Sequence, residues 1–267
     1  MTENSMEPGV FSESLFDEDI RIRASAIMSL GKKGERDAIG PLIDILKNGR
    51  EVEWLRAYAA IALGRLSGDE VIPPLIDALQ DNSMVISRAA IIALGDAGNE
   101  QAIPYLKKIL NDRSKTELHA MTITVLGKIG GHDITQTLIQ SLRSSNNRVR
   151  CCAALALGEL RTEEAVLPFI DLMNDNDECL RGVAASSLGL IGDKRAVGQL
   201  IEALNDGAET VRMIAASSLG YLDDYKAIPP LKKALHDGSK TVRKLAAVAL
   251  SKIEKAKEPA KVYTQNS

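Results

Sequence analysis

The chain has 267 residues and a formal net charge of −3, and 45% of its residues are hydrophobic but only 3% are aromatic. Aromatic rings bury the most area per side chain, so this composition is unusual for a globular core and typical of small aliphatic side chains between closely packed helices. No run approaches the ~18 apolar residues that span a bilayer, and the acidic N-terminus lacks the order of a signal peptide, so we expect a cytoplasmic protein. The three cysteines are an odd count, and two of them are adjacent, which argues against a disulfide framework.

The N-terminal segment, residues 1–16, is expected to be acidic and to contain a degenerate capping helix. Residues 1–19 carry six acids and no bases. Residues 10–16 match the second helix of the repeats that follow, with Phe11 at the position of Leu75 and Leu15 at that of Leu79.

From residue 17 to residue 254 a single pattern recurs with a period of 31 to 33 residues. Each copy contains a Leu-Gly pair, an arginine seven residues before the leucine in six of eight copies, and in all but one an alanine four residues before it. The leucines are Leu30, Leu63, Leu94, Leu126, Leu157, Leu188, Leu219 and Leu250, the last followed by Ser251. The arginines are Arg23, Arg56, Arg150, Arg181, Arg212 and Arg243, with Ser87 and His119 in the other two copies. A fixed period of this length predicts a stack of like units.

Each unit is predicted to hold two helices. In residues 211–222 the apolar and small side chains fall on one helical face, and residues 227–235 form a shorter helix with prolines in its first turn. Five aspartates stand where the cap of the long helix is expected: Asp17, Asp81, Asp175, Asp206 and Asp237. The two residues by which the second copy exceeds the period are placed in the loop near Asn48, Gly49 and Arg50. Neither helix can bury its apolar face alone, so neighbouring units must stack.

The pattern Asp-x-x-x-x-Val-Arg-x-x-Ala-Ala-x-x-Leu-Gly, followed by Ala-Ile-Pro-x-Leu, resembles HEAT repeats of the phycobilisome-lyase type over roughly residues 17–254. The resemblance implies an all-α, right-handed α-solenoid of about eight two-helix repeats, with the long helices on the concave side. Residues 255–267 are expected to form a flexible tail, because residues 256–267 are polar and contain Pro259. It does not fix a function, because the family mixes scaffolds, chromophore lyases and a hydroxylase.

The predicted partner surface is a stripe on the long helices, formed by the side chains six and two residues before each repeat leucine and two after it. An exposed apolar strip with a polar rim is typical of a partner site, although these side chains could instead pack against the adjacent helix. The stripe residues that we expect to contact a partner are Met28, Ile61, Arg65, Arg88, Ile92, Lys128, Leu155, Leu190, Met213 and Tyr221.

Three further features are candidates for binding. Trp54, with Tyr58 near it, is either a binding hot spot or a plug for the gap beside the longer loop. A basic docking site is suggested near the C-terminal end, at Lys232, Lys233, Lys240, Arg243 and Lys244. The arginine column is either a phosphate- or carboxylate-binding row or an internal ladder, and one arginine per repeat favours the ladder.

Catalytic and metal-binding patterns are poor. None of the three histidines is followed by glutamate, although the diiron hydroxylase of this fold family uses His-Glu pairs, and Cys151, Cys152 and Cys179 lack metal-ligand spacing. Phosphate loops, nucleophile elbows and paired carboxylates are not found. The sequence therefore predicts no catalytic residue, no metal and no cofactor.

The favoured function is a non-catalytic scaffold or adaptor that acts as a monomer and binds a protein or peptide along the concave face. The excess of bases over acids on the stripe suits an acidic partner. A bilin lyase is the first alternative, which the family resemblance permits. Nucleic-acid binding along the basic strip is the second, and a sequence pI near 5.8 weighs against it.

Overall fold

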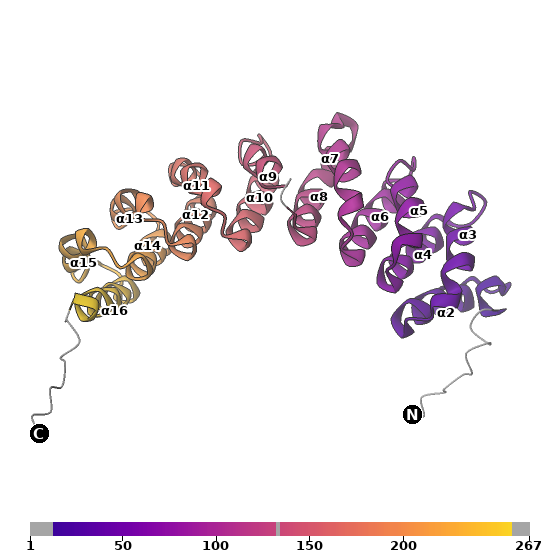
Figure 1. The fold of residues 1–267 in the computed structure, drawn as a ribbon, viewed down its shortest axis with the longest axis horizontal. Coiled ribbons are helices and arrows are strands. Elements are labelled where there is room, and N and C mark those ends of the chain that lie inside the picture. The colour runs from indigo at the N-terminus through magenta and orange to yellow at the C-terminus, as the bar shows by residue number, and fades with distance from the viewer. Residues whose placement is uncertain (1–12, 132–133, 258–267) are drawn as a thin grey trace, which may run out of the picture. The chain divides into compact units, whose positions relative to one another are not determined.

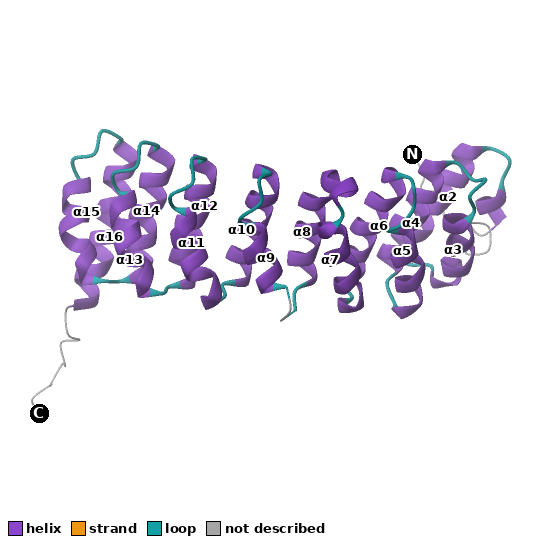
Figure 2. Cartoon of the chain, turned by 90° about the horizontal axis from the view of Figure 1, so that it is seen from above, coloured by secondary structure: helices purple, strands orange, loops and turns teal. Residues whose placement is uncertain are grey.

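The computed structural model describes residues 13–131 and 134–257, and within these ranges all regular structure is helical (Figure 2). The chain divides into two compact units, Met1–Ile134 and Thr135–Ser267. We describe each unit by itself. No helix in the described ranges is both long and apolar enough to cross a membrane.

Both units alternate long and short helices, and within each unit the long helices form one layer and the short helices the other (Figure 1). In unit 1 the long helices are α2 (Ile20–Lys33), α4 (Glu53–Leu66), α6 (Met84–Ala97) and α8 (Thr116–Ile129), and the short ones are α3 (Ile39–Lys47), α5 (Ile72–Ala78) and α7 (Ile103–Asn111). In unit 2 the long helices are α10 (Asn147–Leu160), α12 (Glu178–Ile191), α14 (Glu209–Leu222) and α16 (Lys240–Lys257), and the short ones are α9 (Thr135–Ser141), α11 (Val166–Leu172), α13 (Val197–Ala203) and α15 (Ile228–Ala234). The chain is therefore an all-α solenoid of paired helices, as the period predicts.

Neighbouring long helices touch through the glycine of the Leu-Gly pair. A Cβ added to Gly64 would lie 2.5 Å from Ala93 Cα, and one added to Gly158 would overlap the Ser187 hydroxyl oxygen. Gly31 and Gly220 meet Ala62 and Ala249 in the same way. Such separations leave no room for a side chain, so the glycine allows the two backbones to approach closely. This explains why the Leu-Gly pair is the strongest sequence signal.

The arginine column is an internal ladder. Arg181 donates from Nη1 to the Asp175 carbonyl at 2.8 Å, and from Nε and Nη2 to the Asp206 carboxylate, both at 2.8 Å. Arg212 repeats the arrangement one unit later, on the carbonyl of Asp206 and the carboxylate of Asp237. Each guanidinium thus binds the loop before its own helix and the loop of the next repeat. The alternative of a binding row is excluded for these half-buried side chains.

The ladder corrects the prediction that the five aspartates cap the long helices. The actual N-cap positions lie two residues later, at Asp177 for α12 and Ala208 for α14. Asp175 and Asp206 instead accept hydrogen bonds from the backbone N–H groups of those two residues, at 2.9 and 2.8 Å. Their carboxylates also pair with the arginine of the preceding repeat: Arg150 lies against Asp175, and Arg181 donates to both oxygens of Asp206. The position therefore serves the loop and the ladder rather than the helix end.

Two smaller expectations concern the N-terminal half. Of the expected capping helix, Val10 and Phe11 lie outside the described residues, while Ser14–Phe16 form a 3-10 helix (η1) whose Leu15 is buried. The two extra residues of the second copy were predicted in the loop, but α3 itself has 9 residues where α5 has 7. The insertion therefore lengthens the short helix.

Candidate functional site

The outward face of the long helices is the candidate site, and we call it the long-helix face. It consists of the predicted stripe together with the side chains nine and five residues before each repeat leucine. The stripe reaches solvent: Met28 and Leu155 are exposed, and Ile61, Ile92 and Met213 are half-buried. The remaining predicted stripe residues, Arg65, Arg88, Lys128, Leu190 and Tyr221, are all exposed.

In unit 1 an aromatic pair stands on this face. Trp54 and Tyr58 pack edge to face with ring centroids 5.5 Å apart, and they are 38% and 36% exposed. Both belong to α4, one turn apart, and Ile61 follows on the same side of the helix. Two aromatic rings held against each other and still open to solvent have the properties of a binding hot spot.

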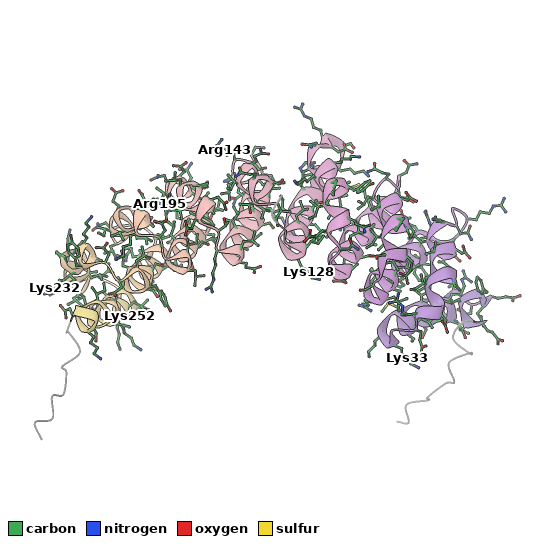
Figure 3. All side chains as sticks on the ribbon, viewed as in Figure 1. Lys33, Lys128, Arg143, Arg195, Lys232 and Lys252 are labelled. Carbon is green, nitrogen blue, oxygen red and sulfur yellow. The ribbon has the colours of Figure 1, made fainter. Side chains whose placement is uncertain are left out.

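Unit 1 also carries exposed cations on this face. Lys32, Arg65 and Arg88 are exposed on α2, α4 and α6, and within the described ranges none of them forms an ion pair. Lys128 of α8, labelled in Figure 3, is paired with Asp96 at 2.7 Å. The long-helix face of unit 1 is therefore both aromatic and positively charged.

In unit 2 the face carries a cleft of about 650 Å³ that spans α10, α12 and α14. Its apolar lining comes from Leu155 on α10, Val183 and Leu190 on α12, and Ile214 on α14. The two leucines project into solvent, at 55% and 46% exposure. An apolar hollow of this size that is open to solvent is typical of a site for a partner's side chain.

Gly182, in the first half of α12, lines the floor of the cleft. The equivalent positions in the other long helices of this unit hold Cys151, Met213 and Lys244. A Cβ added to Gly182 would meet Ile214 Cδ1 at 3.3 Å, which is tight but against the end of a flexible side chain. A side chain at residue 182 would therefore fill the hollow from its floor.

Two serines hold the helices around the cleft at close distance. The Ser218 hydroxyl of α14 donates to the Ala185 carbonyl of α12 at 2.8 Å, at the point where Ser218 packs on Gly189. Ser187 packs on Gly158 on the other side of α12. Three helices are thus fixed at close distance, so the cleft is preformed.

The charges at the rim of the cleft differ from those of unit 1. Glu159 and Glu178 line it, against one base, Arg161. Asp177 and Glu209 stand beside it, at the starts of α12 and α14, and the hydrogen bond from the Asn147 side chain holds the pKa of Asp177 below its usual value. The rim therefore presents more negative than positive charge.

The three cysteines lie on α10 and α12. Cys151 and Cys152 are half-buried, while Cys179 is exposed and lines the cleft, and all three are free thiols. Burial raises the pKa of the Cys151 thiol, so it is a poor nucleophile.

The suggested basic docking residues do not gather on one surface. Lys232 and Lys233 belong to α15 in the short-helix layer, where Figure 3 labels Lys232, and Lys232 lies 3.7 Å from Glu254. Lys240 and Lys244 belong to α16. Arg243 is half-buried and donates to the carbonyls of Asp237 and Gly238, as the last arginine of the ladder.

Sequence reasoning missed part of the face. Val183, Ile214 and Cys179 lie five or nine residues before their repeat leucines and were not counted in the stripe. Helical periodicity could have found them, because a residue seven positions before a stripe residue lies on the same side of the helix. The depth of the cleft at Gly182 could not be predicted from a single repeat, because residues of three repeats line it.

Stacked pairs of long and short helices, joined by a glycine contact and an arginine ladder, define an α-helical repeat protein. A family model of HEAT repeats matches residues 42–120, 112–189 and 166–251, so the chain belongs to the HEAT-repeat family. A comparison with curated proteins found no match.

Several solved structures are similar. One is from the complex of CpcE and CpcF of phycocyanin lyase from Nostoc sp. PCC7120, with 25% identity, 94% of this chain and 97% of that chain covered, and a TM-score of 0.53. Another is Escherichia coli YibA, with 22% identity, coverage of 94% and 93%, and a TM-score of 0.67. A chain in the structure of Kap95p bound to RanGDP matches with 14% identity, coverage of 92% and 39%, and a TM-score of 0.64. The first likeness supports the phycobilisome-lyase type of repeat, and the other two support the fold alone.

Proposed function

We propose that the chain is a non-catalytic scaffold that binds a protein or peptide along its long-helix face, as a monomer in the cytoplasm. The observation that carries this proposal is the gathering of exposed large apolar side chains on the long-helix face. They are Met28, Trp54, Tyr58 and Val85 in unit 1, and Leu155, Leu190, Tyr221 and Val248 in unit 2. Exposed apolar side chains cost free energy in water, and their concentration on one layer is typical of a partner surface.

The chemistry of unit 1 favours an acidic segment as the partner. Trp54 and Tyr58 offer flat apolar area, and Lys32, Arg65 and Arg88 on the same face have no ion-pair partner within the described ranges. Complementary charge speeds association and selects among partners, while the aromatic rings supply most of the affinity. A segment with acidic residues on either side of an apolar anchor satisfies both.

Two of the similar structures are complexes between proteins, those of CpcE with CpcF and of Kap95p with RanGDP. They support a binding role for proteins of this fold. The partner of this chain depends on its own long-helix face and not on the surfaces of those two proteins.

The test is affinity capture from a lysate of the cells that make the protein, with the full chain immobilised and the captured proteins quantified by mass spectrometry. Tyr58→Ser and Trp54→Ser should each lower the yield of the partner by about tenfold, the effect of losing a hot-spot side chain. Tyr105→Ser is the matched control. Tyr105 lies on short helix α7 of the same unit, and its exposed fraction of 38% is similar to the 36% of Tyr58. A partner retained by all variants would show that the aromatic pair is not the site.

A bilin lyase is the second candidate, and the likeness to the CpcE–CpcF structure favours it. A lyase of this kind must hold a tetrapyrrole. Visible absorbance that copurifies with the protein, or appears when a bilin is added, would support this candidate and count against a purely structural role. We expect neither.

A further inference from the structure

We infer that the cleft of unit 2 is a second binding site, and that its occupant is a protein segment with an apolar anchor side chain flanked by lysine or arginine. This site goes beyond the acidic partner proposed for unit 1, and its chemistry is the opposite. The inference rests on the shape of the cleft, on its apolar lining and on the charge at its rim.

The lining demands an apolar anchor. Leu155, Val183, Leu190 and Ile214 come from three successive helices and converge on the hollow above Gly182. Filling it would remove apolar surface from water on all four, at roughly 25 cal/mol per Å². Because the surrounding helices are fixed by the Ser218 and Ser187 contacts, the site needs no rearrangement to accept a side chain.

The exposure of the walls favours a segment over a small molecule. Sites for small molecules enclose most of the ligand's surface. Here Leu155 and Leu190 are themselves about half exposed, so a molecule confined to the hollow would cover only the sides of these leucines that line it. A side chain that arrives on a protein segment fills the hollow while its backbone and neighbours cover the leucines.

The rim selects the charge of that segment. Glu159 and Glu178 lie on opposite sides of the apolar lining, at the end of α10 and the start of α12, and neither forms an ion pair within the described ranges. Arg161 is the one base among the lining residues. An occupant with basic residues near its anchor gains two carboxylate partners, whereas an acidic occupant meets like charge.

The probe is a library of random 12-residue peptides displayed on phage, selected on the immobilised full chain after removal of clones that bind the Gly182→Met chain. The variant fills the cleft, and it should fold because Met213 already occupies the equivalent position of α14. We expect enriched peptides with Leu, Ile or Phe and with Lys or Arg within four residues of it. No enrichment, or enrichment of acidic peptides, would contradict the inference.

One enriched peptide, made synthetically and labelled, is then titrated with full-length variants by fluorescence anisotropy. Leu155→Ser and Gly182→Met should each weaken binding by about tenfold or more. The matched controls are Leu167→Ser and Gly198→Met, because Leu167 is 58% exposed on short helix α11 and Gly198 faces open space on α13. Equal losses in variants and controls would contradict a site at the cleft.

Charge is tested with the double variant Glu159→Gln, Glu178→Gln. It should weaken peptide binding by about fivefold at low salt, since an exposed ion pair contributes up to about 1 kcal/mol. Unchanged affinity would contradict the basic flank. Self-association of the wild-type chain that Gly182→Met abolishes would identify a second copy as the occupant and would also contradict the proposal. Tyr58→Ser should leave peptide binding unchanged, so this site and the face of unit 1 can fail independently.

Discussion

At the scale of single residues, glycine has opposite roles at two kinds of position. Gly64 brings α4 against α6, and Gly182 leaves a space that no other residue fills. The first role follows from the repeat and is visible in the sequence. The second depends on which side chains of α10 and α14 border the gap, so only the structure shows it.

Gly64→Ala should destabilise the protein by about 1–3 kcal/mol, the usual cost of overpacking, although alanine is the better helix former by about 1 kcal/mol. The added Cβ would lie 2.5 Å from Ala93 Cα and 2.6 Å from its carbonyl oxygen, so α6 must move. Gly198→Ala is the control, because nothing lies within 4 Å of the Cβ it would add. Denaturant melts should show a lower free energy of unfolding for Gly64→Ala and a slightly higher one for Gly198→Ala. Equal behaviour would mean that the long helices are not in close contact.

At the scale of elements, the arginine ladder joins each long helix to the loop of the next repeat. The sequence period predicted the helix pairs, and the spacing of Arg181 suggested a ladder. It could not assign Asp206 correctly, because that residue's two partners come from different repeats: Ala208 in its own loop and Arg181 from the repeat before. Likewise, a single stripe was predicted where the two units present faces of different chemistry.

Asp206→Asn should lower the free energy of unfolding by about 1–2 kcal/mol at neutral pH. This lies between the contributions of exposed ion pairs and of hydrogen bonds to charged groups. The hydrogen bonds from Arg181 hold the pKa of Asp206 below its ordinary 3.8. A carboxyl group with a lowered pKa in the folded state stabilises the fold above its unfolded pKa and loses this contribution as the pH falls through the folded value.

Thermal melts of wild type and Asp206→Asn should therefore differ at pH 7. The difference should shrink as the pH falls below 3.8, the ordinary pKa of Asp, and should vanish once the pH is below the lowered pKa of Asp206 in the folded state. Asp171→Asn, on the exposed surface of α11, is the control and should change little at either pH. A difference that persists undiminished at the lowest pH would show that the carboxylate charge is not what stabilises the ladder.

At the scale of the whole molecule, the repeats are expected to be interchangeable structurally and different functionally. Most repeats supply a like glycine contact and a like ladder step, although Ser87 and His119 replace the arginine in two copies and Ser251 replaces the glycine in the last. Stability is therefore close to a sum over neighbours. The binding faces instead depend on positions that the repeat leaves free, such as Trp54 in unit 1 and Gly182 in unit 2. This is why the fold could be predicted from the period, whereas the faces required the positions of neighbouring side chains.

The most direct test of this separation is to excise one repeat, residues 175–205, from the full chain. The cut removes α12 and α13 and brings like surfaces together: Gly158 would face Ser218 in place of Ser187, and Arg150 would reach Asp206 in place of Asp175. We predict a soluble, helical protein with a cooperative melt, which still captures the partner of unit 1 but no longer binds the cleft peptide. Aggregation, or loss of the unit 1 partner together with the peptide, would contradict a stack of interchangeable repeats with two separate binding faces.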